Sequence, residues 1–163
     1  MLVGIKSQVR NLLLIGCCML FCNGIQVAHA QNFTTASYYL LSSNTNLGNG
    51  WADIDSALYY KNATYFYNSY TDLSSAYNNA YIAYNYAVAG YNSYPTTLGY
   101  YSYYWSYYNY LYAYSASLYA YNSYLYGVAS VYVPSLIYYI SLADQSNGYA
   151  AYFCGLSSIG GTQ

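Results

Sequence analysis

The sequence predicts an all-α protein, an elongated antiparallel helical hairpin of two long tyrosine-rich helices with short flanking helices. Three observations support this: residue types recur every seventh position, a proline turn divides the repeat, and small residues form a continuous stripe in its second half. The alternative is a β-rich, cross-β-like assembly. Tyrosine has good strand propensity, and tyrosines alternate with other residues over positions 108–114.

Residues 1–30 have the pattern of a secretory signal peptide. Lys6 and Arg10 precede an apolar run over residues 12–21, and Ala28-His29-Ala30 is a cleavage site of the A-x-A type. The apolar run is too short for a membrane span. A lipoprotein signal at Cys17 is the alternative. We therefore expect a secreted, periplasmic or cell-surface protein that begins at Gln31.

The segment 31–50 follows as an N-terminal piece and linker. Residues 35–42 are weakly amphipathic, whereas residues 43–50 consist mainly of Asn, Ser, Thr and Gly, which favour turns. The tyrosine-rich hairpin is then expected over residues 51–133.

The first long helix is predicted over residues 51–93. Read in sevens, this stretch has aromatic columns at heptad positions a, d and e and a polar or small face opposite. A strand would not keep these columns on one face, since seven steps reverse the face of a period-two structure. Asp53 and Asp55 are predicted in the first turn, where the helix dipole favours negative charge.

The second long helix is predicted over residues 97–133, after a turn at Tyr94-Pro95 and a cap at Thr96 or Thr97. Gly, Ser, Ala and Asn residues spaced three and four apart form a small-residue stripe, which we expect at a close helix contact. Almost every other column is aromatic or aliphatic, so this helix is expected to be covered on most sides.

The end of the chain, residues 134–163, is predicted as a short helix and a tail. Pro134 ends or kinks the second helix, residues 135–143 form a short third helix, and residues 146–148 form a turn. The remainder is expected to be only partly ordered.

The composition argues against catalysis, metals and cofactors. After cleavage at Ala30 the charged residues are one lysine and four aspartates, without His, Arg or Glu. Acid–base catalysis and zinc binding need groups that this chain lacks, so we expect no enzyme, no catalytic residues, no metal and no cofactor. Nucleic-acid binding needs a basic groove, so we also expect no nucleic-acid partner. We expect no membrane span, because the sequence has no run of 18 apolar residues. Cys154 is either a buried thiol or an interchain disulfide.

Two functional hypotheses remain. The first is an exported structural protein of a cell envelope, coat or extracellular matrix, which forms a homo-oligomer or polymer through tyrosine faces. The second is an aromatic carbohydrate-binding or surface-adhesion module, with polysaccharide or other envelope components as partners. Aromatic rows on an outer face would favour adhesion, and mutual burial of the rows would favour assembly. The candidate assembly residues are Tyr70, Tyr77, Tyr84, Tyr91, Tyr103, Tyr107, Tyr110, Tyr114, Tyr121 and Tyr124.

Overall fold

The computed structural model describes the backbone of residues 2–160 and the side chains of residues 27–160. The helices are α1 (Leu2–Tyr60), α2 (Thr64–Ser93), α3 (Thr97–Tyr126) and α4 (Tyr132–Gly160). No strand occurs within residues 2–160. The predicted all-α class is confirmed, and the β-rich alternative is wrong for the single chain.

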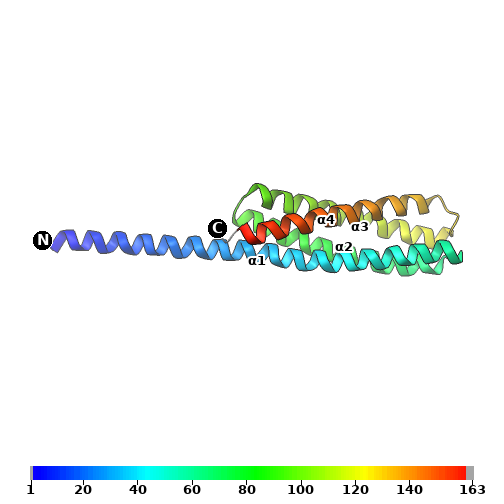
Figure 1. Cartoon of the computed structure of the whole chain (residues 1–163), viewed down its shortest axis with the longest axis horizontal. Coiled ribbons are helices and arrows are strands. Elements are labelled where there is room, and N and C mark those ends of the chain that lie inside the picture. Colours follow the sequence, from blue (N-terminus) through cyan, green and yellow to red (C-terminus); the bar gives the residue numbers. More distant parts are fainter. Residues whose placement is uncertain (1, 161–163) are drawn as a thin grey trace.

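The four helices form an elongated antiparallel bundle (Figure 1). Each helix packs on its neighbours in the order α1, α2, α3, α4 and back to α1, while diagonally opposite helices scarcely touch. Short connections over residues 61–63, 94–96 and 127–131 make successive helices antiparallel. The first half of α1 projects beyond the bundle, and the chain end of α4 lies beside the point where α1 enters it.

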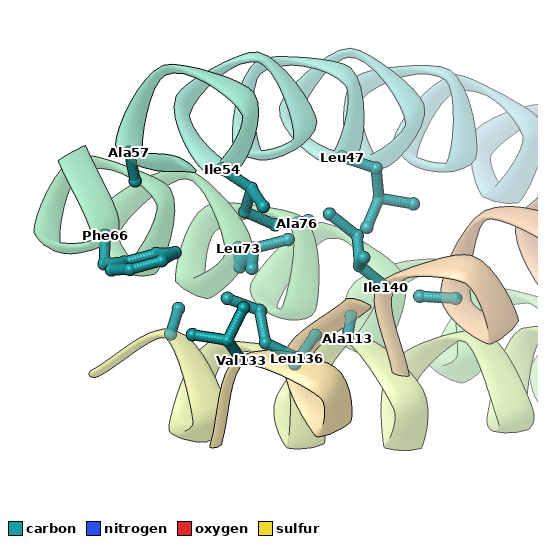
Figure 2. Close-up of a cluster of buried hydrophobic side chains, with 13 residues drawn as sticks. Leu47, Ile54, Ala57, Phe66, Leu73, Ala76, Ala113, Val133, Leu136 and Ile140 are labelled. Carbon is teal, nitrogen blue, oxygen red and sulfur yellow. The ribbon is translucent and has the colours of Figure 1, made fainter. Parts of the chain in front are cut away.

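Small and aliphatic residues, together with Phe33 and Phe66, form the core. On each helix the buried positions alternate at spacings of three and four, which is the seam of a left-handed bundle. Large seam residues of α1, such as Leu40 and Leu47, share core clusters with the alanines of the α2 seam. One core cluster draws side chains from all four helices, including Ile54, Leu73 and Leu136 (Figure 2). The small-residue stripe of residues 99–123 forms the seam of α3, as expected.

The first predicted long helix is divided in two by a tight turn. α1 ends at Tyr60 because Lys61 adopts a left-handed conformation (φ 49°), and the Asn62 backbone N–H then donates to the Ala57 carbonyl at 3.2 Å. This is the bonding pattern of a Schellman helix end, with lysine at the position usually taken by glycine. The Asn62 side chain accepts from the Thr64 N–H at 3.0 Å and starts α2.

Residues 43–50, predicted as a linker, are helical within α1. Ser43 Oγ donates to the Ala76 carbonyl and Ser69 Oγ donates to the Gly50 carbonyl, both at 3.1 Å. A Cβ on Gly50 would lie 2.9 Å from a Leu73 methyl, so glycine is what permits this helix contact. Packing therefore outweighs the poor helix propensity of the segment.

The predicted position of Asp53 and Asp55 in a first helical turn is wrong for the same reason. Because α1 continues through the expected linker, both carboxylates lie near the C-terminal end of a helix.

The central turn is where the sequence predicts it. Tyr94 is extended (φ −152°, ψ 93°) before Pro95, and Thr96 caps α3 by accepting from the Gly99 N–H at 3.0 Å. α2 and α3 therefore form an antiparallel hairpin, shorter than predicted because each has 30 residues.

The predictions for residues 127–160 need correction. α3 stops at Tyr126, and Gly127 follows with a positive φ of 87°. Pro134 lies in the first turn of α4. Backbone N–H groups in a first turn have no carbonyl acceptor within the helix, so a proline there breaks no helical hydrogen bond. α4 then runs without a break through the expected turn at 146–148 and the expected tail, because Asn147, Ala150 and Cys154 continue its buried seam.

The predicted signal peptide falls mostly outside the residues whose side chains the structure describes. His29 is the first α1 residue with a described contact to another helix, through Nδ1 to the Gly90 carbonyl at 2.9 Å. Among the described residues, none of the helices carries an apolar stretch long enough to cross a membrane.

Candidate functional site

Tyrosine lies on the outside of the bundle. The chain has 31 tyrosines, and none of them is buried in the part of the chain that the structure describes. The seams are filled mainly by small or aliphatic residues, together with Phe33 and Phe66, so the tyrosine rings take the positions beside each seam. There they are half-buried against a neighbouring helix or exposed.

The longest array of rings follows the groove between α2 and α3. α2 and α3 are antiparallel, so a step of seven residues forward on α2 corresponds to a step of seven residues backward on α3. An equivalent pair of tyrosines therefore recurs in each heptad. Facing pairs and their ring-centroid distances are Tyr67 and Tyr124 (5.3 Å), Tyr70 and Tyr121 (5.2 Å), Tyr77 and Tyr114 (5.3 Å), Tyr81 and Tyr110 (5.6 Å), Tyr84 and Tyr107 (5.5 Å), and Tyr91 and Tyr100 (6.3 Å). We call these rings, with Tyr103 on Tyr91 at 5.2 Å, the α2/α3 tyrosine row.

Rings in the row pack on one another at favourable separations. Centroid distances near 5 to 6 Å lie within the range in which tilted and edge-to-face aromatic pairs attract. The Tyr110 ring, for example, contacts four others, namely Tyr77, Tyr81, Tyr84 and Tyr107. The most exposed ring of the row, Tyr67, is 47% exposed. Each ring therefore covers part of its neighbours and leaves the remainder facing solvent.

All ten candidate assembly residues belong to this row. The heptad pattern identifies them on α2 and α3 separately, and the structure brings them into a single groove. The candidate set omits Tyr67, Tyr81 and Tyr100, although these lie in neighbouring aromatic columns of the same heptads. The column that begins at Tyr70 lies beside the α2 seam rather than in it, because the seam takes Phe66, Leu73 and smaller residues.

Some phenols on α3 have a raised pKa. Burial among neighbouring rings, followed by the charges that adjacent phenolates would carry, raises the pKa of Tyr103 and of Tyr110. A hydrogen bond with Tyr108 is the main cause that raises the pKa of Tyr104. At neutral pH the surface is therefore one of uncharged hydroxyl donors and acceptors.

A second aromatic feature is a groove of about 740 Å³ between α3 and α4. Trp105 packs on Tyr149 at 4.7 Å and Tyr101 on Phe153 at 5.2 Å, which lines the groove with rings. Gly148 also lines this groove, and a Cβ there would meet nothing within 4 Å. No sequence signal predicts this groove, since its lining depends on how α3 and α4 pair.

Cys154 lies in the core and not on a surface. Its side chain is fully buried and free. Burial raises the pKa of the thiol to about 12, although hydrogen bonds from Ser102 and Ser106 act to lower it. Of the two alternatives for Cys154, the structure describes the buried thiol, and an interchain disulfide would require α4 to open.

One pair of carboxylates faces across two helices. Burial, followed by the charge of Asp72 and a hydrogen bond to it, raises the pKa of Asp53. No group of three or more His, Cys, Asp or Glu side chains within the described residues is arranged to hold a metal ion.

Comparison of the chain with protein-family models, with curated proteins and with solved structures finds no match. A function for this chain is therefore inferred from its own geometry and chemistry.

Proposed function

We propose that the chain is an exported, non-enzymatic structural protein of a cell envelope, coat or extracellular matrix, which self-associates through its tyrosine surface. The observation that carries the proposal is the α2/α3 tyrosine row, a half-exposed array of uncharged rings along a whole helix pair.

The composition of this surface supports association between copies. Charged residues make up only 4% of the chain, and residues 73–143 contain none. A protein with little net charge and contiguous exposed apolar surface associates readily. Tyrosine is also enriched at protein interfaces, since its ring buries a large area while its hydroxyl keeps a hydrogen bond.

The chemistry of the row supports a non-enzymatic role. An activated nucleophile needs a lowered pKa or an adjacent base. The pKa values of Tyr103 and Tyr110 in the row are instead raised, by burial among other rings. These groups suit packing and hydrogen bonding better than proton transfer.

Adhesion and assembly each require a particular arrangement of the rings, and both requirements are met in part. The length of the row is therefore the deciding feature. The rings lie on an outer face, as adhesion requires, and they cover one another, as assembly requires. A row along a helix of 30 residues, about 45 Å, is much longer than one small ligand and fits a second extended surface.

The proposal of export rests on the cleavage site predicted from the sequence, which lies where α1 makes its first described contact with another helix. Cleavage after Ala30 would remove His29, which makes the first described contact of α1 with the bundle, but would keep the α1 seam from Phe33 onward. We expect N-terminal sequencing of protein recovered from the culture medium or periplasm to begin at Gln31. Recovery of the chain only from the cytosol, with residues 1–30 intact, would contradict export.

Association is tested by removing three rings from the row. We expect Y107S, Y114S and Y121S together to weaken self-association of the purified protein at least tenfold in sedimentation experiments. The matched control is Y38S, because Tyr38 is 66% exposed on α1 away from the row. Helix content by circular dichroism should be the same in all samples. Equal association of the triple variant and the parent would refute a role for the row.

A second candidate function, carbohydrate binding, is favoured by the groove between α3 and α4. Trp105 and Tyr149 present rings that could stack on a sugar face, and Gln145 supplies an amide at the same groove. Titration calorimetry with cello- and chito-oligosaccharides would detect such binding, and W105A should abolish it. Absence of heat with every oligosaccharide would remove this candidate.

A further inference from the structure

We propose that the α2/α3 tyrosine row is a site of oxidative carbon–carbon cross-linking that joins α2 to α3 within one chain. This modification does not depend on self-association, because both reacting rings belong to the same molecule.

The geometry of three pairs carries the proposal. Tyr70 and Tyr121, Tyr77 and Tyr114, and Tyr84 and Tyr107 have centroids 5.2, 5.3 and 5.5 Å apart and ring planes inclined by 52°, 50° and 52°. Ring edges at these distances are in contact. The arrangement repeats with the heptad, so the fold places three equivalent pairs of phenols in position to react.

The chemistry needs a one-electron oxidant, which we take to be a peroxidase using hydrogen peroxide. Each of two facing phenols loses one electron and one proton and becomes a phenoxyl radical with spin density on the carbons ortho to oxygen. The radicals couple through two ortho carbons, and the hydrogens on those carbons move to the oxygens, which restores both phenols. Two tyrosines and one hydrogen peroxide thus yield one dityrosine and two waters.

Proximity favours coupling within the row over coupling elsewhere. A radical on Tyr77 already has Tyr114 beside it, so the second ring need not be found by diffusion. Tyr38, in contrast, packs on Tyr39, its own neighbour in sequence, and a radical there reaches other helices only by collision. Cys154, which could quench radicals, is buried in the core.

The test treats an equal mixture of unlabelled and heavy-nitrogen-labelled purified protein with peroxidase and limiting hydrogen peroxide. Mass spectrometry of proteolytic fragments then identifies each cross-linked pair. We expect fragments that join α2 to α3 at the row, each either wholly light or wholly heavy, and a loss of two hydrogens per bond. Such chains should run as single chains on denaturing gels and show dityrosine fluorescence.

Results that would overturn the proposal are equally specific. They are dityrosine found only in mixed light–heavy fragments, dityrosine confined to residues outside the row, and no dityrosine under conditions that cross-link free tyrosine. Because the isotope pattern separates bonds within a chain from bonds between chains, the outcome is independent of whether the protein self-associates.

A conservative variant identifies the reacting rings. Y70F, Y77F and Y84F together keep the ring packing but remove the α2 phenols of the three pairs, and we expect the yield of fragments joined at these pairs to fall severalfold. The matched control is Y38F, Y59F and Y152F, at exposed rings outside the row, with an unchanged yield. An equal fall in both variants would show that the row has no special reactivity.

Discussion

Gly90 determines how closely α2 approaches α1 at one end of the bundle. A Cβ at this position would lie 2.8 Å from Cε2 of the Phe33 ring, which also packs near Gly99. Phe33 is fully buried, so its ring has little room to move. We expect G90A to destabilise the protein by about 1 to 3 kcal/mol, the usual cost of overpacking.

Urea unfolding followed by circular dichroism measures this effect. The matched control is G48A, because Gly48 lies exposed in α1 and a methyl group added there would meet nothing within 4 Å. The control should be neutral or stabilising by up to about 1 kcal/mol, as expected for Gly to Ala within a helix. Loss of stability in G48A but not in G90A would contradict the close α1/α2 contact.

The Asp53 and Asp72 pair predicts a small pH dependence of stability. A raised pKa means that folded Asp53 holds its proton more tightly than the unfolded chain does, so this stabilisation exists in acid and is lost as pH rises through the folded pKa. At neutral pH the pair is then repulsive. We expect D53N to raise the free energy of unfolding at neutral pH by about 0.5 kcal/mol or less, because both groups are partly exposed.

The gain from D53N should disappear below about pH 3, where the carboxyl is protonated in both states. D55N provides the control, since Asp55 is an exposed carboxylate two residues further along α1. Chemical denaturation at both pH values measures the difference. A gain that is larger in acid than at neutral pH would contradict the assigned direction.

Burial of Cys154 predicts that its thiol is inert in the folded protein. With a pKa of about 12, little thiolate forms at neutral pH, and the side chain is out of contact with solvent. We expect labelling by a disulfide reagent to occur only as fast as the bundle opens, and rapid labelling in denaturant. Immediate labelling of native protein, or a reducible dimer on gels, would place Cys154 at a surface.

At the scale of the helices, an amide network that is buried at Asn109 and Asn147 and reaches the surface at Asn44 lies between the two apolar clusters of the core. Asn109 Nδ2 donates to Asn147 Oδ1 at 2.8 Å, and Asn147 Nδ2 donates to Asn44 Oδ1 at 3.4 Å. A buried Asn at a seam position fixes register at some cost in stability. Here the network aligns α3 with α4 and α4 with α1.

We expect N109A to destabilise the protein by about 1 to 3 kcal/mol, because it leaves Asn147 Oδ1 buried without its donor. N147A should cost a similar amount, and the double variant should cost less than the two together, with a coupling of about 0.5 kcal/mol or more. Thermal and urea unfolding of the three variants measure the cycle. Strict additivity would mean that the two amides do not interact.

The heptad pattern predicts the helical class, the central turn and the tyrosine columns of α2 and α3, but not the number of helices or the pairing of the columns in one groove. Tyr94-Pro95 marks its turn in sequence, whereas Lys61 turns the chain without glycine or proline. Conversely, residues 43–50 resemble a linker by composition and are helical because Ser43 and Gly50 are needed at the α1/α2 contact. Both differences arise from tertiary packing, which local propensity does not contain. The groove at Trp105 depends likewise on the pairing of α3 with α4.

For the whole molecule, the bundle places mainly small residues inside and the tyrosine rings outside. Most soluble helical proteins bury their large apolar side chains, whereas here the seams of α2 and α3 are mainly Ala, Ser and Gly. The rings of Phe33 and Phe66 are buried in the core, but the small seams elsewhere bring the helices too close for tyrosine, which covers the grooves between helices. Much of the exposed ring area can then be removed from water only by contact with another surface.

Alkali should reverse association through the same rings. Unperturbed phenols titrate near pH 10, and burial raises the pKa of Tyr103 and Tyr110 above that value. The neutral form is therefore favoured in the packed state, and its stabilising effect is lost as pH rises through these values. Salt should matter little at neutral pH, since few charges exist to be screened.

Sedimentation of the purified protein over a wide concentration range, at neutral pH and again near pH 12, tests the self-association of the tyrosine surface most directly. We expect an average mass that rises with concentration at neutral pH, well above the 18.3 kDa of one chain, and dissociation in alkali. A single chain at every concentration at neutral pH would contradict self-association. So would an assembly that dissolves in concentrated salt at neutral pH but survives alkali without covalent cross-links.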